Sequence, residues 1–258
     1  MRAGLVLAAL AALSLAPQAA GAAAAKGGAQ SIAAKRAAMG GAWNRYPDTG
    51  EDPIPGIPVP PPIPAPPLKA PYKAEWEATQ KKLAAMTAAG QPIFNNYARC
   101  IGDGMPAMMM GMFPMEILQT PGQITIIQEA YNQVRRVKMN QKQTDIGDTE
   151  PTFAGHAVGR WEGDTLLLDT IAVKDSIHFR ETPHSDQMRI SERLRLIKPD
   201  VLQNEVTVTD PVYLEGPWKW TWVYTRKPGY TLYEYVCEDN RQFQDPETGG
   251  TRLKVTQR

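Results

Sequence analysis

GHAVGRWEGDTLLLDT, residues 155–170, is the stretch from which the fold can be worked out. Gly163 and Asp164 at its centre are typical of a two-residue β-hairpin turn, because glycine supplies the positive φ that such turns require. With that turn fixed, the strand register is fixed as well. It places these residues opposite one another: Glu162 and Thr165, Arg160 and Leu167, Val158 and Asp169, and His156 and Ile171.

These residues share one face of the hairpin, where Asp169 lies diagonally between His156 and Arg160, within reach of either side chain. The other face is mostly apolar and carries Ala157, Gly159, Trp161, Leu166, Leu168 and Ala172. Because both faces are partly apolar, alternation leaves open which one is buried. If the His156 face points inward, its charged groups must satisfy one another; if it points outward, they form a surface ion pair of small worth.

Around this hairpin the sequence continues, from about residue 115, in short segments of period two separated by turn signals such as TPG, EGD, KPD and KPGY. The segments are MEILQT, QITIIQEAY, VRRVKM, GHAVGRWE, DTLLLDTIAV, QMRISERLRLI, VLQNEVTVTD, WKWTWVYTRK and TLYEYVC. Short strands without intervening helices predict an antiparallel meander. Because closure removes exposed edges, residues 94–258 are predicted to form an all-β domain that closes into a lipocalin-like barrel, with a β-sandwich as the alternative.

The segment QMRISERLRLI holds one carboxylate in an otherwise apolar row. Glu192 alternates with apolar residues, while the other row is basic and polar. Glu192 is therefore predicted to point inward, with no partner in its own strand. Arg160 or His156 is the expected partner, in an arrangement that suits proton transfer. A buried ion pair that only fixes the strand register explains the pattern equally well.

The segment WKWTWVY places Trp218, Trp220 and Trp222 on one face, either as the wall of an apolar ligand cavity or as core filling. The segment MPAMMMGMFPM holds six of the chain's eleven methionines. Met109 and Met112 are predicted to form an apolar gate over that cavity, because methionine makes adaptable apolar contacts. Binding of Cu(I) by the thioethers is the alternative, and the absence of His and Cys from the segment disfavours it.

The sequence predicts no cofactor and no metal site. His178 and His184 lie on a proline-containing loop that fits the rim of a cavity. A three-histidine metal site that includes His156 is disfavoured, because the chain has no short-spaced ligand motif. A nucleophile elbow, a phosphate loop and a dinucleotide fingerprint are missing from the sequence too.

The N-terminal third contains no predicted strand. Residues 1–25 place one arginine before an apolar run that ends in small residues, which predicts the signal peptide of a periplasmic or secreted protein. Residues 26–71 are rich in Ala and Gly and then in Pro, which predicts a disordered, polyproline-like arm that serves as a spacer or, less favoured, as a ligand for a proline-binding partner. Residues 72–93 have helical apolar spacing and end in Gly90 and Pro92, which predicts one amphipathic helix.

Charge and cysteine content limit the partners. Residues 1–25 hold one of the 28 Lys and Arg and none of the 27 Asp and Glu, so the remainder carries 27 of each and has no formal net charge. Nucleic acid is therefore not an expected partner, and no stretch reaches the roughly 18 apolar residues of an integral membrane span. In an oxidising compartment Cys100 and Cys237 are predicted to form a disulfide, with two buried thiols as the alternative. The oligomeric state is left open.

The hairpin sequence resembles the G-H-S-V-G-x-W-E-G-D-T-L-x-V-D-T core of a large family of uncharacterised exported bacterial proteins. Further similarity covers most of the chain after the signal peptide: YKAEW, ARC, EILQTPGQITII, VRRV, PHSDQMRISERLRL, EVTVTDP and EYVCEDNR. The core matches at His156, Gly159, Trp161, Glu162, Gly163, Asp164 and Asp169. Ala157 replaces the usual serine, Leu168 replaces the usual valine, and the methionine run stands where members more often have Pro-Tyr-Pro. The resemblance implies export and no particular activity.

Three functions fit these observations. The preferred one is binding of a small apolar or aromatic molecule inside the barrel, with the Trp row as its wall. The second is an acid–base enzyme, a lyase, isomerase or hydrolase, in which His156 is the base, Asp169 orients it, Arg160 stabilises a developing anion and Glu192 is a second acid. The third is a structural module of the cell envelope that uses the proline arm as a spacer.

Overall fold

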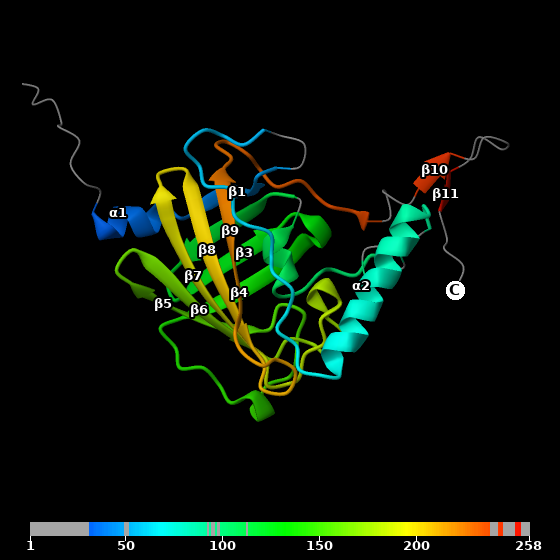
Figure 1. Ribbon diagram of the computed structural model, residues 1–258. Helices are drawn as coiled ribbons and strands as arrows, with labels where there is room; N and C mark the ends of the chain where they lie inside the picture. Colours follow the sequence, from blue (N-terminus) through cyan, green and yellow to red (C-terminus); the bar gives the residue numbers. More distant parts are fainter. Residues whose placement is uncertain are drawn as a thin grey trace, which may run out of the picture. The chain divides into compact units, whose positions relative to one another are not determined.

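A computed structural model describes residues 31–48, 52–91, 93, 96, 99–111, 113–237, 242–244 and 251–253. Within these residues nine strands form one closed barrel in sequence order, and the last strand, β9, pairs with the first, β1 (Figure 1). The predicted all-β barrel is therefore confirmed. The predicted signal peptide, residues 1–25, lies outside the described residues.

The barrel strands and the helices have the following bounds. The strands are β1 (Gly41–Tyr46), β2 (Met115–Thr120), β3 (Gln123–Gln128), β4 (Gln133–Met139), β5 (His156–Glu162), β6 (Thr165–Ile171), β7 (Arg189–Lys198), β8 (Val201–Thr209) and β9 (Trp218–Arg226). The α-helices are α1 (Ile32–Ala37) and α2 (Tyr72–Ala88), and the short 3-10 helices are η2 (Ala107–Met110), η3 (Ala130–Asn132), η4 (Ile146–Asp148) and η5 (Phe179–Glu181). A separate two-stranded sheet pairs β10 (Gln242–Gln244) with β11 (Thr251–Leu253).

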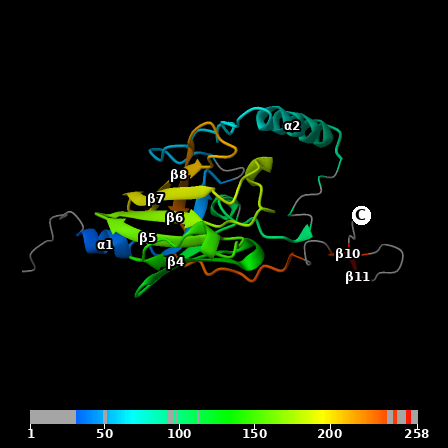
Figure 2. The ribbon, with the colours of Figure 1, turned by 90° about the horizontal axis from the view of Figure 1, so that it is seen from below.

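The prediction of an uninterrupted antiparallel meander is wrong between β4 and β5, which run parallel. A parallel pair needs a crossover rather than a tight turn, and residues 140–155 provide it. The two strands pair only from Val137 to Met139 on β4 and from Ala157 to Gly159 on β5. The first half of β4 pairs with β3 alone among the described strands, so the barrel wall parts at this place. Figure 2 shows β4 to β8 in their sheet order.

The prediction that residues 26–71 form an arm without core is wrong for the part that the structure describes. Strand β1 lies inside that range and closes the barrel between β2 and β9. Trp43 on β1 is fully buried, its indole Nε1 donates to the carbonyl of Met39 at 3.0 Å, and the Arg226 guanidinium lies 4.2 Å from its ring centre. This strand is only six residues long, and the sequence around it is rich in Ala, Gly and Pro, so composition alone does not reveal it.

The proline-rich segment that follows is bound to the barrel rather than free. The indole Nε1 of Trp218 donates to the carbonyl of Pro64 at 2.9 Å, and Arg180 Nη1 donates to the carbonyl of Ile63 at 3.0 Å. Leu68 is buried and forms a β-bridge with Leu214. In Figure 1 this segment is the cyan trace that runs down beside β9 to the start of α2. Proline still imposes the extended conformation, but hydrogen bonds and the buried Leu68 attach the segment to the barrel.

The predicted helix forms as α2, and none of its residues is buried. It is attached to the barrel through Trp76, whose Nε1 donates to the carbonyl of Arg180 at 2.9 Å, and through Tyr72, whose ring centre lies 4.5 Å from that of Tyr213. In the described part of the chain no helix combines the length and the apolar character needed to cross a membrane.

The predicted disulfide between Cys100 and Cys237 is confirmed. The predicted strand TLYEYVC is wrong, because residues 231–237 form no strand. The carboxylate of Glu129 binds this segment instead, accepting hydrogen bonds from the Tyr230 hydroxyl at 2.8 Å and the Tyr233 backbone N–H at 2.9 Å. The segment is thus held by contacts with a side chain rather than by the backbone hydrogen bonds of a strand pair.

Candidate functional site

The hairpin register predicted from the Gly163-Asp164 turn is confirmed at every pair. The structure also decides which face is buried. Ala157, Leu166 and Leu168 are buried in the core, whereas His156 and Asp169 are half-buried and Arg160 is exposed on the outer face. A side chain at Gly159 would put its Cβ 2.8 Å from Val137 Cγ1, so the barrel closes tightly on the inner face.

The four residues predicted to be catalytic are therefore only partly brought together: the charge of Arg160 acts on Asp169 on the outer face, but Glu192 lies inside the barrel. Asp169 pairs with Arg189, with 3.4 Å between carboxylate and guanidinium. His156 Nε2 lies 2.8 Å from the carbonyl of Glu150, and among the described residues Arg160 forms no ion pair. Glu192 points to the other side of the sheet. The outer residues and Glu192 are separated because a strand sends neighbouring side chains to opposite faces.

The prediction that Glu192 points inward is confirmed, since it is 1 % exposed. The prediction of its partner is wrong: Glu192 Oε2 accepts a hydrogen bond from Nη2 of Arg135 on β4, a fully buried residue. The same Nη2 donates to Thr170 Oγ1 at 2.8 Å. Asn204 Nδ2 donates to the second oxygen of Glu192 at 2.9 Å. Four strands thus contribute to one polar centre inside the barrel.

This polar centre, which we define as Arg135, Thr170, Glu192 and Asn204, contains buried atoms without a hydrogen-bond partner. They are Nε and Nη1 of Arg135 and Oδ1 of Asn204. Trp220 Nε1 is another such atom, and the strand register brings Trp220 level with Glu192 through Val206 on β8. Each buried polar group left unpaired costs about 1–3 kcal/mol, so these atoms retain the capacity for further hydrogen bonds.

Tyr224 lies beside the polar centre on β9. Its hydroxyl donates to the carbonyl of Met109 at 2.7 Å and so ties η2 to the barrel wall. Burial raises the pKa of Tyr224, and the carboxylate of Glu192 raises it further. Tyr224 therefore stays protonated and serves as a hydrogen-bond donor.

Sequence reasoning missed Arg135, although a signal for it exists. Arg135 alternates with Val137 and Met139, so it is the single charged residue in the inward row of β4, as Glu192 is in that of β7. Each inward row thus contains one charged residue, and the two charges are of opposite sign. A buried charge needs a partner, so the pattern predicts that Arg135 and Glu192 form an ion pair. The neighbouring Arg136 obscured this, because either arginine fits an inward position when the register is unknown.

The predicted tryptophan wall lies inside the barrel. Trp218, Trp220 and Trp222 are buried, and consecutive rings of the row lie 4.9 and 5.4 Å apart. The Phe179 ring from η5 lies 5.3 Å from that of Trp220 and covers the row. A cavity of about 20 Å³ remains between Trp218, Phe179 and the methionine segment. Met109 is buried in that segment, and Met112 lies outside the described residues.

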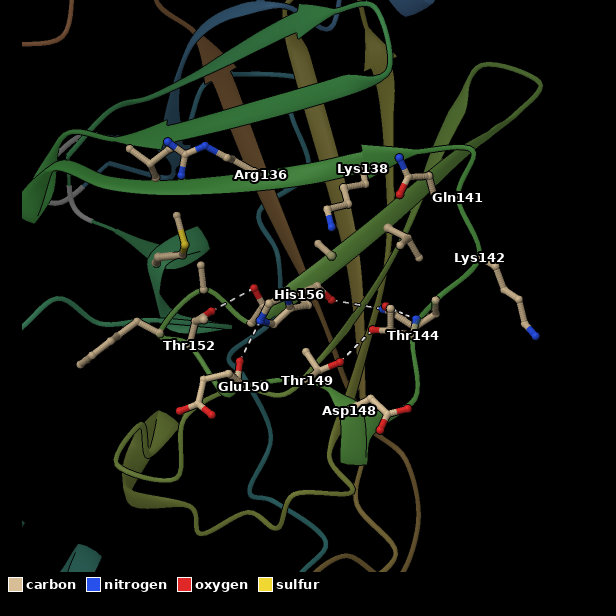
Figure 3. Close-up of a pocket in the computed structure, with 18 of the residues that line it drawn as sticks. Arg136, Lys138, Gln141, Lys142, Thr144, Asp148, Thr149, Glu150, Thr152 and His156 are labelled. Atoms are coloured by element: carbon tan, nitrogen blue, oxygen red, sulfur yellow. Dashed lines mark hydrogen bonds between the residues drawn. The ribbon is translucent and has the colours of Figure 1, made fainter.

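A larger cleft opens on the outer face where β4 and β5 part (Figure 3). It measures about 690 Å³ and lies between the first half of β4 and the crossover segment 140–155. Its lining includes Met108, Val134, Arg136, Lys138, Phe153 and His156. The predicted base His156 thus lies in a cleft, but outside the barrel and without Asp169 as its partner.

Asp169, on the outer face of the hairpin, predicts that the stability of the fold depends on pH. Burial raises the pKa of Asp169 above its ordinary value of 3.8, although the Arg189 guanidinium opposes this. The folded state therefore holds this proton more tightly than the unfolded state, and its loss destabilises the fold as pH rises. Asp169→Asn should raise the free energy of unfolding by about 0.5 kcal/mol at pH 7. The gain should be full above the raised pKa, should shrink as pH falls from that pKa toward 3.8, and should be absent below 3.8.

Urea unfolding of both proteins between pH 3.5 and pH 7 measures this effect. Asp175→Asn, at an exposed carboxylate, is the matched control and should show no comparable pH-dependent gain. A less stable Asp169→Asn variant at pH 7 would mean that the Arg189 ion pair outweighs burial.

Comparison with known proteins adds no relative, since neither a protein-family model nor a curated protein matches the chain. The resemblance of the hairpin to a family of exported proteins therefore stays a prediction. The arguments for function rest on the polar centre, the tryptophan row and the outer cleft.

Proposed function

We propose that the protein is an exported barrel that binds a small, uncharged apolar or aromatic molecule carrying one hydroxyl or carbonyl oxygen. The observation that carries this proposal is the set of buried, unpaired polar atoms of Arg135, Asn204 and Trp220. They lie in an otherwise apolar interior that includes the tryptophan row. Binding sites for small molecules combine apolar walls with a few polar anchors in this way.

The charges of the polar centre favour a neutral ligand. Arg135 and Glu192 are both fully desolvated and neutralise each other. An incoming anion would leave a net negative charge in the barrel, which is costly in a low-dielectric interior. A hydroxyl group accepts from Arg135 and donates to Asn204 Oδ1 at the same time, so an alcohol or phenol meets both needs.

The apolar part of the ligand would lie against the tryptophan row. The existing cavity of about 20 Å³ admits a water-sized group, so an aromatic molecule requires the methionine segment to move aside. Met105 lines this cavity, and Met108 and Met109 are buried in the same segment, all at 1 % exposure or less. Methionine side chains rearrange more easily than branched ones, which supports their predicted role as a gate.

The two other functions have less support. An acid–base enzyme built on His156, Asp169, Arg160 and Glu192 would need groups that lie on opposite sides of the barrel wall. A purely structural module does not account for the unpaired polar atoms of the core. Export rests on the predicted signal peptide, and the disulfide is compatible with an oxidising compartment.

Calorimetric titration with p-cresol and toluene tests the proposal, because the two probes differ by one hydroxyl group. We expect saturable binding of p-cresol at least tenfold tighter than that of toluene, since a buried site built for a hydroxyl rejects an analogue that lacks it. Trp220→Phe keeps an aromatic ring at this position and removes the indole N–H, and it should narrow the difference in affinity between p-cresol and toluene.

The control is the double variant Arg135→Met with Glu192→Leu, which replaces the ion pair by apolar groups of similar size. It should narrow the difference between the two probes, with Asn204 and Trp220 left as the polar anchors. If the unaltered protein binds neither probe, the interior is a closed core and the proposal fails. If it prefers toluene, the polar centre does not anchor a hydroxyl and the proposal fails as well.

A further inference from the structure

The cleft where β4 and β5 part is chemically different from the barrel interior. We propose that it is a second binding site, for a small organic anion with an apolar or aromatic body. It opens to solvent on the outer face, whereas the polar centre is fully buried. The two proposals rest on different polar residues, so each can fail without the other.

The apolar part of the cleft has an unusual composition for a protein surface. Val134 is 37 % exposed and Phe153 is 38 % exposed, and both line the cleft. Met108, 1 % exposed, forms part of its floor, so the cleft reaches the hydrophobic core. Apolar side chains gathered in a concave site favour an apolar ligand surface.

The charged part of the cleft favours an anion. Arg136 and Lys138 on β4 both line the cleft, and in the described part of the chain neither forms an ion pair. In Figure 3 the Lys138 side chain points into the cleft toward His156, whereas the Arg136 side chain runs along β4. The carboxylates of Asp148 and Glu150 point away from these two cations in the same view. An anion beside Lys138 therefore meets an unpaired cation, and Arg136, on the same face of β4, can turn toward it to add a second charge-assisted hydrogen bond, a class that is among the strongest in proteins.

The wall opposite β4 is held in place by specific hydrogen bonds. Gln143 Nε2 donates to the carbonyls of His156 at 3.1 Å and Asp169 at 2.9 Å, which fixes the crossover segment to the hairpin. The hydroxyls of Thr144 and Thr149 lie 2.9 Å apart. A fixed wall lowers the entropy lost on binding, so the cleft is prepared for a ligand.

His156 supplies a polar group of defined orientation between the two walls. A carbonyl oxygen only accepts hydrogen bonds, so the 2.8 Å contact with Glu150 places a proton on His156 Nε2. In neutral histidine the other nitrogen, Nδ1, then accepts a hydrogen bond. An anion that also carries a hydroxyl or N–H group fits this arrangement best.

Calorimetric titration with 2-naphthoate tests the inference, with naphthalene-2-methanol as the uncharged analogue. We expect saturable binding of 2-naphthoate that weakens as salt is added. Lys138→Gln and Arg136→Gln should each lower its affinity about tenfold, as expected for loss of a charged hydrogen bond. Phe153→Ala should weaken 2-naphthoate binding and leave the weaker binding of acetate unchanged.

Lys142→Gln is the matched control, because Lys142 lies at the cleft but points away from it (Figure 3). It should change the affinity less than twofold. Equal losses in Lys138→Gln and Lys142→Gln would mean that 2-naphthoate is attracted only by general surface charge, and the site would be rejected. Equal binding of the acid and the alcohol would also overturn it. Neither result would bear on the binding of p-cresol inside the barrel.

Discussion

Replacement of Glu192 by leucine is expected to lower the free energy of unfolding by about 3–5 kcal/mol. The substitution leaves Arg135 charged and fully buried, with only Thr170 still bonded to its guanidinium. Such a charge has no access to water and no opposite charge to offset its desolvation. Urea unfolding at pH 7, followed by circular dichroism, measures the loss.

Adding Arg135→Met to this variant separates the ion pair from its surroundings. Because a well-packed apolar pair often replaces a buried ion pair without loss, the double variant should regain most of the stability lost by Glu192→Leu. The coupling energy from the four proteins of this cycle then measures the pair itself. A double variant as unstable as the single one would show that Glu192 stabilises the barrel mainly through Asn204.

Replacement of Trp43 by alanine is expected to cost about 3–5 kcal/mol, as for other fully buried tryptophans. The loss includes the hydrogen bond to Met39 and the contact with the Arg226 guanidinium, both of which hold β1 in the barrel. Thermal and urea unfolding measure the effect.

Trp43→Phe is the matched control, since it keeps an aromatic face for Arg226 and removes the indole N–H. It should cost less than Trp43→Ala. If Trp43→Ala changes stability by less than 1 kcal/mol, within the range of exposed positions, residues 41–46 do not form a barrel strand and the arm predicted from composition is right after all.

The parts of the fold that local chemistry determines could be predicted from the sequence. The Gly163-Asp164 turn alone gave the correct pairing along the whole hairpin, because side-chain period and turn length leave one register. The parallel pairing of β4 with β5 could not be predicted, since nothing in residues 140–155 distinguishes a crossover from a long hairpin loop. Strand β1 was missed because its partners, at residues 115–117 and 223–226, are remote in sequence.

The candidate site also has features that one strand predicts and features that depend on the closed barrel. Alternation along one strand was enough to predict that Glu192 points inward. Its pairing with Arg135 depends on how the barrel closes. The predicted meander lacked β1 and the parallel pairing of β4 with β5, so it did not place β4 across the barrel from β7. The outer cleft exists because β4 and β5 separate, so no pattern within either strand reveals it. His156 was correctly singled out as a polar residue of interest, but the choice of face needed the closed barrel.

The pairing of β1 with β9 makes completion of the barrel depend on both ends of the domain. Trp43 lies opposite Arg226, so the pairing of β1 with β9 joins residues that are nearly as far apart in sequence as the barrel strands allow. Such contacts form late in folding, because the loop they close is long and its entropy must be lost first. Until Trp218–Arg226 is available, β1 and β8 each present an unpaired edge, and unpaired edges associate with those of other chains. A polypeptide that ends before β9 should therefore aggregate rather than fold into a smaller barrel.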